Sequence, residues 1–147
     1  MPVRPARESD RHSWERMREG LWPSLPGRHA RDIERYFAGE LREPVEVFLA
    51  FDDQGEAAGL IELSIRAYAE GCVTDRVAFI EGWYVEPTAR GSGIGAALVA
   101  AAESWARSRG CVELGSAAEV DNLASAAAHR AIGFEEAGVI CCFKKAL

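Results

Sequence analysis

The sequence has no long apolar run and no signal-like N-terminus. Its longest stretch without a charged residue, Gly91–Ala102, is rich in glycine and much shorter than the ~20 apolar residues that cross a bilayer. The first residues, MPVRPARESDR, carry charge but not the apolar segment of a secretory signal. We therefore expect a cytoplasmic protein with no membrane partner.

An excess of basic residues is also missing. The chain has 17 Lys and Arg against 23 Asp and Glu, a net charge of -6. Nucleic-acid binding requires a basic face, so we expect no nucleic-acid partner. A negative surface attracts cationic ligands over long distances, although the same charge can serve solubility alone.

The four cysteines form no metal-binding pattern. Cys72, Cys111, Cys141 and Cys142 lack the spacing of metal ligands, and we expect no metal. The adjacent pair lies in an apolar run and would point to opposite sides of a strand. In a reducing compartment we expect buried structural thiols rather than disulfides.

A length of 147 residues fits a single domain, residues 1–147. Apolar periodicity and turn residues predict a meander of strands followed by crossovers, hence a mixed α/β (α+β) sheet flanked by about four helices. Gly82, inside an apolar strand, indicates a bulge or a close backbone approach. The expected strands are 3–5, 45–51, 57–68, 77–85, 111–115 and 139–143, and the expected helices are 10–20, 30–41, 92–108 and 122–133.

Glycines recur at alternate positions in EPTARGSGIGAA, residues 86–97. Glycine costs backbone entropy and adds no side-chain packing, so Gly91, Gly93 and Gly95 need a reason. They stand between a predicted strand and a predicted helix, where backbone N–H groups and the helix dipole attract anions. Without β-carbons, a phosphate could reach those amides.

Three classes of phosphate-binding site are candidates for such a loop. A Walker loop needs Lys followed by Ser or Thr, and the chain has Ala96 and Ala97. A dinucleotide fingerprint is formally satisfied, with Glu113 about twenty residues on. However, that turn follows its strand at once and opens its fold, whereas here EPTAR intervenes and a meander comes first. A coenzyme A pyrophosphate is the third candidate.

Arg90-x-x-Gly93-x-Gly95, after a strand ending in YVEP, resembles the acyl-CoA signature of the GNAT family of N-acetyltransferases. The order of predicted elements is similar along nearly the whole chain, and Asn122 with AIGF ending at Phe134 resembles a second half-signature. The resemblance implies the GNAT fold, acetyl-CoA as acetyl donor, and homodimers, which are common in the family. It places cofactor binding at Trp83, Tyr84, Val85, Arg90, Gly91, Ser92, Gly93, Ile94, Gly95, Ala96 and Asn122.

Four stretches, LWP, SIRAYAEGC, FIEGWYV and HRAIGFEE, resemble bacterial aminoglycoside 6'-N-acetyltransferases. The resemblance implies that Trp22, Tyr68 and Glu81 line the antibiotic pocket. The chain departs from that pattern at three positions. Ala117 stands where the relatives carry an acidic residue, and a second acidic residue near Gly138 is missing. A histidine near Leu25 is missing as well. Nearby acids that could compensate are Glu119, Asp121, Glu135 and Glu136.

Acetyl transfer needs an unprotonated amine, and Glu81 could accept the proton directly or through water. A backbone N–H near Val85 would stabilise the oxyanion. Many family members have a tyrosine for thiolate protonation where this chain has His129. Alternatives stay open: Glu81 as an exposed charge, His129 as a helix-stabilising residue, and Trp22 and Tyr68 as core. The function also stays open: the substrate could be another amine or a protein N-terminus, or the protein could be a non-catalytic acyl-CoA-binding module.

Overall fold

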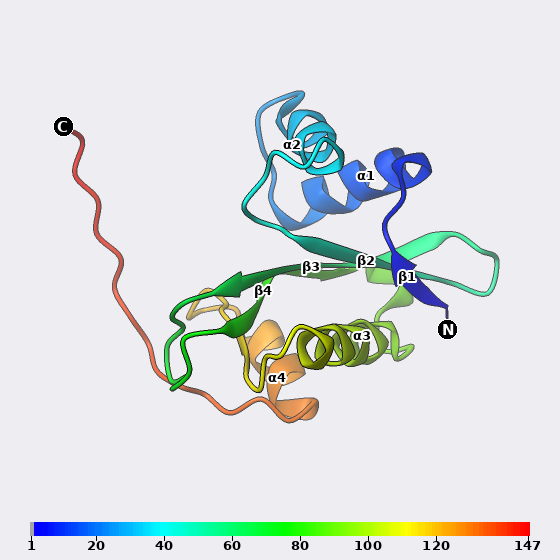
Figure 1. Cartoon of the computed structure of the whole chain (residues 1–147). Helices are drawn as coiled ribbons and strands as arrows, with labels where there is room; N and C mark the ends of the chain where they lie inside the picture. The colour runs from blue at the N-terminus through cyan, green and yellow to red at the C-terminus, as the bar shows by residue number, and fades with distance from the viewer. Residues whose placement is uncertain (1) are drawn as a thin grey trace.

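In the computed structural model, which describes residues 2–147, a five-stranded sheet lies between two pairs of helices (Figure 1). No helix in these residues is long and apolar enough to cross a membrane. The strands are β1 (Val3–Pro5), β2 (Glu46–Phe51), β3 (Ala57–Arg66), β4 (Val77–Val85) and β5 (Leu114–Ser116). The helices are α1 (Arg11–Leu21), α2 (Arg28–Phe37), α3 (Ile94–Ser108) and α4 (Leu123–Ala131), with 3-10 turns at Glu8–Asp10 and Pro87–Ala89.

The sheet order is β1-β2-β3-β4-β5. The first four strands form an antiparallel meander, and β5 is parallel to β4 after the crossover through α3. Helices α1 and α2 cover one face of the sheet, and α3 and α4 lie on the other (Figure 1). The expected mixed α/β (α+β) class is therefore confirmed.

Strand β3 supplies both cores because its side chains alternate between the faces. Leu60 packs with Trp14 and Met17 of α1. Ile61 belongs to the cluster around α3, which includes Leu98. All five side chains are almost completely buried, so the sheet is fixed between two apolar layers and offers a rigid base for a site.

Several predicted boundaries shift where glycines set the chain direction. Helix α2 begins after Gly27, which has φ +81, and it ends before Gly39, which has φ +74. The prediction of 30–41 therefore runs too far at the C-terminal end. Strand β3 ends two residues earlier than predicted, at Arg66, and β5 covers 114–116 rather than 111–115.

The predicted strand at 139–143 is wrong. The chain after Phe134 has no regular structure and runs away from the sheet (Figure 1). Val139, Ile140 and Phe143 are 66%, 60% and 93% exposed. The apolar pattern favours a strand, but a strand also needs a neighbouring edge, and the tail pairs with none in residues 2–147.

The cysteine prediction is partly wrong for the same reason. Cys111 is buried and Cys72 partly buried, but Cys141 and Cys142 are exposed because the tail carries them outward. All four thiols are free.

Candidate active site

A bulge in β4 arranges the centre of the site. The register with β3 shifts after Glu62, and Glu81 is the extra residue. Ile80 and Trp83 therefore pack toward α3, whereas Glu81 and Gly82 both face the α1 side. Bulges commonly re-aim side chains in this way. The predicted bulge or close approach at Gly82 is confirmed in both respects.

Strand β5 follows β4 for only three residues, from Ala78 to Ile80. Beyond that point, residues 81–85 have no strand partner on this edge within the described chain. The backbone groups on this edge can therefore pair with an extended ligand, as a sheet edge pairs with an added strand. The resemblance described above predicts cofactor binding at Trp83, Tyr84 and Val85, which lie on this edge.

The glycine loop has two kinds of glycine. Gly91 and Gly93 have φ +80 and +91, and open space surrounds the position of each missing β-carbon. A β-carbon on Gly95 would instead lie 3.2 Å from Trp83 Cζ2, so this glycine allows α3 to pack closely on β4. Gly93 is the N-cap of α3, and the first N–H groups of a helix have no intrahelical partner. The loop therefore offers free amides to an anion.

Side chains tie this loop back to the strand. Arg90 Nε donates to the Val85 carbonyl at 2.9 Å, and the Ser92 hydroxyl donates to the Ala89 carbonyl. The Tyr84 side chain packs with the α1 core, and the Arg90 guanidinium lies 5.7 Å from the centre of its ring. Burial, with the Glu86 carboxylate, raises the pKa of Tyr84.

Glu81 is a paired carboxylate. Arg66 Nε and Nη2 donate to its two oxygens at 2.9 and 2.7 Å, and the buried Ser64 hydroxyl donates a third bond. The hydrogen bond with Glu81 raises the pKa of Arg66 against the effect of partial burial. The Glu81 side chain is 16% exposed, so it is not a simple surface charge. The sequence analysis missed Arg66, although it shares a strand face with Ser64.

The two predicted aromatic residues are not core residues. Tyr68 follows the end of β3 and is 65% exposed, and Trp22 follows α1 and is 36% exposed. The ring of Trp22 lies over Gly82, next to Glu81. Ordinary core packing therefore does not explain either side chain.

His129 joins α4 to the end of β5. Its Nδ1 lies 2.7 Å from the Ser125 carbonyl oxygen, which can only accept, so this nitrogen carries a hydrogen. Its Nε2 lies 2.8 Å from the Ser116 hydroxyl. The ring also packs edge-on against Trp83 and Phe134. His129 thus stands beside the open edge of β4, with Ser116 as a partner that the sequence did not indicate.

The polar residues after β5 remain at the surface. Asn122 caps α4 by accepting from the Ser125 N–H at 3.1 Å. Glu119 and Asp121 are exposed, and neither carboxylate has an ion-pair partner between positions 2 and 147. Glu136 pairs with Arg130 at 3.1 Å.

The model of the acetyltransferase (GNAT) family matches residues 14–134. The chain belongs to the GNAT family. The open edge of β4 and the glycine loop at the start of α3 therefore lie in an acetyltransferase fold, and the predicted family resemblance is confirmed.

Relatives of this GNAT chain carry a consistent description. An aminoglycoside N(6')-acetyltransferase type 1 from Klebsiella aerogenes is 48% identical over 99% of this chain and 96% of its own length. One from Stenotrophomonas maltophilia is 38% identical over 99% and 93%.

Solved structures agree. The aminoglycoside 6'-N-acetyltransferase AAC(6')-IG from Acinetobacter haemolyticus, at 35% identity, superposes with a TM-score of 0.90 over 100% of this chain and 99% of its own. AAC(6')-Iy in complex with the bisubstrate analogue CoA-S-monomethyl-acetylneamine, at 31% identity, has a TM-score of 0.90 over 99% and 98%.

Proposed function

We propose that this protein transfers the acetyl group of acetyl-CoA to the 6'-amine of aminoglycosides. The observation that carries the proposal is the position of Glu81, a partly buried carboxylate where β4 parts from β5. The relatives described above, which span nearly the whole chain, support the substrate class. Both substrates would bind together, with direct transfer between them.

At neutral pH the acceptor amine is mostly an ammonium and must lose a proton before it attacks the thioester. Glu81 accepts this proton, directly or through a water molecule. A backbone N–H near Val85, on the open edge, stabilises the oxyanion. The departing thiolate takes a proton from Nε2 of His129 in its imidazolium form, since Nδ1–H donates to the Ser125 carbonyl. This Nε2 lies 2.8 Å from the Ser116 hydroxyl at the end of β5.

The cofactor binds along the open edge of β4 and at the loop before α3. The pyrophosphate meets the amides from Gly91 to Ala96, with Arg90 alongside, and Asn122 contributes from the start of α4. The positive φ of Gly91 and Gly93 and the helix N-terminus support this placement.

The aminoglycoside binds on the α1 face of β4. Trp22 and Tyr68 offer partly exposed rings to the sugars, and Glu81 provides negative charge. Glu119 and Asp121 are surface carboxylates without an ion-pair partner in residues 2–147, and they would attract further ammonium groups. The net charge of -6 supports a polycationic substrate.

We further propose that residues 1–147 act as one domain in a cytoplasmic homodimer that confers aminoglycoside resistance. The exposed apolar tail supports self-association, because Val139, Ile140 and Phe143 lack packing in the described chain. The four free thiols suit a reducing compartment. Light scattering of the full chain and of a chain ending at Phe134 tests the dimer, and drug susceptibility of cells with and without the protein tests resistance.

The decisive experiment supplies acetyl-CoA and a mixed panel of amines, including kanamycin, tobramycin, polyamines and a peptide N-terminus, and identifies products by mass spectrometry. We expect monoacetylated kanamycin and tobramycin, with the acetyl group on the 6' nitrogen by NMR. Gentamicin components without an amine at that carbon should be poor substrates. An acetyl group elsewhere would contradict the regiochemistry, and turnover of other amines only would contradict the substrate class.

A further inference from the structure

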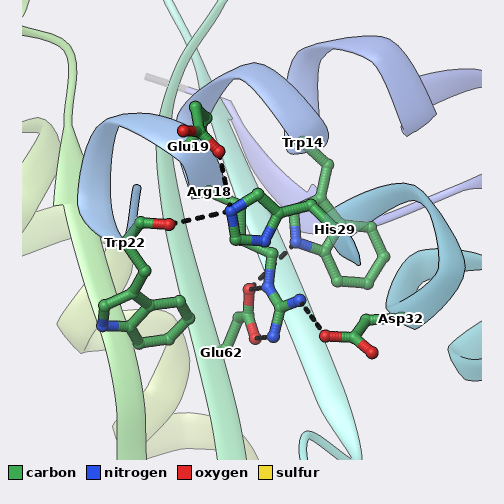
Figure 2. A network of polar contacts seen from close by, with 7 residues as sticks. All are labelled: Trp14, Arg18, Glu19, Trp22, His29, Asp32 and Glu62. Atoms are coloured by element: carbon green, nitrogen blue, oxygen red, sulfur yellow. Dashed lines mark hydrogen bonds and ion pairs between the residues drawn. The ribbon is translucent and has the colours of Figure 1, made fainter. Parts of the chain in front are cut away.

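Trp22 is held by hydrogen bonds at its backbone and by a cation near its ring, and Figure 2 shows the contact between its carbonyl and His29. Its N–H donates to the Arg18 carbonyl at 2.7 Å, and its own carbonyl lies 2.8 Å from His29 Nε2. The Arg18 guanidinium lies 5.3 Å from the centre of the ring. His29 is buried and also lies 3.0 Å from the Glu19 carboxylate. The position of this tryptophan is thus determined by several independent contacts.

A buried ionic network fixes Arg18 in turn. Its Nε donates to Glu62 at 2.9 Å and its Nη1 to Asp32 at 2.9 Å. Glu62 is 1% exposed and also accepts from Trp14 Nε1 at 3.0 Å. Burial alone would lower the pKa of Arg18, but the two carboxylates outweigh it and raise the pKa. The guanidinium therefore stays charged next to the Trp22 ring.

The third feature that positions the Trp22 ring is the absence of a side chain at Gly82. A β-carbon on Gly82 would lie 2.6 Å from Trp22 Cη2 and 3.0 Å from Leu21 Cδ2. Gly82 does not have a positive φ, so its backbone would accept alanine without strain. Glycine inside a strand weakens it. The contact with the Trp22 ring accounts for the glycine at this position.

We propose that Gly82 is a specificity-determining residue because its missing side chain seats the Trp22 ring against β4. The bulge brings Glu81 and Gly82 to the same face, so the seated ring forms the wall of the acceptor site next to the carboxylate. A β-carbon lifts the ring and displaces the sugar from Glu81. This inference rests on the proposed function for its substrate but on the contacts above for its geometry.

A double-mutant cycle of Gly82→Ala and Trp22→Ala tests the proposal, with steady-state kinetics on kanamycin and with the melting temperature. Small misplacements near the reacting groups can cost up to ~10²-fold. We expect Gly82→Ala to raise the KM for kanamycin roughly 10-fold and to leave the KM for acetyl-CoA within about twofold. In the Trp22→Ala background the same change should have a much smaller effect on the KM for kanamycin, because only the contact with Leu21 Cδ2 remains. Gly82→Ala should also lower the melting temperature more when Trp22 is present than in the Trp22→Ala background.

Gly59→Ala is the control, since its β-carbon would collide with Ile94 and Leu98 on the other face of the sheet. It should lower the melting temperature without the selective rise in the KM for kanamycin. Additive effects of the two changes would overturn the proposal, as would an equal rise in the KM for acetyl-CoA. A loss of melting temperature in Gly82→Ala that depends on Trp22, with no change in the KM for kanamycin, would also overturn the proposal. Wild-type inactivity on every aminoglycoside would instead overturn the proposed function, a failure that the wild-type assay alone reveals.

Discussion

Arg66 and Glu81 face each other in two parallel hydrogen bonds, Nε to Oε1 at 2.9 Å and Nη2 to Oε2 at 2.7 Å. The pair lies where β4 loses its partner β5. The guanidinium rests on the ring of Phe79, 3.7 Å from its centre. The carboxylate that we propose as the proton acceptor is therefore held by a fixed cation at the same time.

Replacing this carboxylate should remove catalysis and spare cofactor binding. For Glu81→Gln we expect kcat to fall by about 10²–10⁴-fold, because the amide cannot accept the proton. Acetyl-CoA affinity, measured by calorimetry, should hardly change. Glu34→Gln, on an exposed position of α2, is the control. Wild-type turnover by Glu81→Gln from pH 6 to 9 would show that Glu81 only binds or supports the fold.

The loop before α3 should be needed for acetyl-CoA to stabilise the fold. Wild type should melt at a higher temperature with acetyl-CoA but not with NADH. Gly93→Val should abolish this shift, because a bulky residue blocks the loop. Gly110→Val is the matched control, since Gly110 also has a positive φ and open surroundings but lies after α3. A shift with NADH and none with acetyl-CoA would restore the dinucleotide hypothesis.

His129 should contribute less than Glu81. Water or another group can protonate a thiolate, so we expect His129→Ala to lower kcat by a smaller factor than Glu81→Gln does. Ser116→Ala removes the hydroxyl that lies 2.8 Å from His129 Nε2, and it should lower kcat in the same direction. Single-turnover kinetics separates this chemical step from product release. Unchanged kcat in both variants would assign the pair to stabilisation of α4.

Salt should affect the two substrates differently. The Debye length is about 10 Å at 0.1 M and shrinks as salt rises, which weakens attraction between exposed charges. The apparent affinity for kanamycin, a polycation, should therefore fall with increasing NaCl. Acetyl-CoA is an anion and the protein has a net charge of -6, so its long-range interaction should not weaken in the same way. A kanamycin KM that is constant in salt would contradict electrostatic recruitment.

Asp10 should make stability depend on pH in the acid range. Hydrogen bonds from Arg4 lower the pKa of this buried carboxyl below its ordinary 3.8, and a bond from the Arg7 N–H adds to the effect despite burial. A lowered folded pKa gives stability that is complete above the unfolded value and is lost as pH falls through the folded value. Asp10→Asn should cost about 1–3 kcal/mol at pH 7.

The difference between Asp10→Asn and wild type should shrink toward zero below pH 3.8, measured by urea unfolding across the pH series. Glu8→Gln is the control, because the Glu8–Arg11 pair is exposed and such pairs contribute little. A difference that stays constant from pH 7 to pH 2.5 would assign the effect to packing rather than charge.

Local patterns in the sequence were sufficient to predict most of the helices and strands. The meander, the crossover and the glycine loop follow from apolar periodicity, turn residues and an anion-binding pattern. The predicted strand at 139–143 failed because a strand forms only where the chain pairs with a neighbouring strand, and no local pattern encodes that pairing. The predicted bulge at Gly82 succeeded because glycine inside a strand is itself a signal.

The sequence alone therefore predicted the family, the glycine loop before α3 and Glu81 as the candidate base, because these depend on residue types, short spacing and the order of elements. Only the tertiary structure decided that Arg66 pairs with Glu81, that Ser116 meets His129, and that Trp22 rests on Gly82. These contacts join residues 13 to 60 positions apart in the chain. Strand register and the single-residue bulge bring them together, and both result from the packing of the whole sheet between its two helical layers.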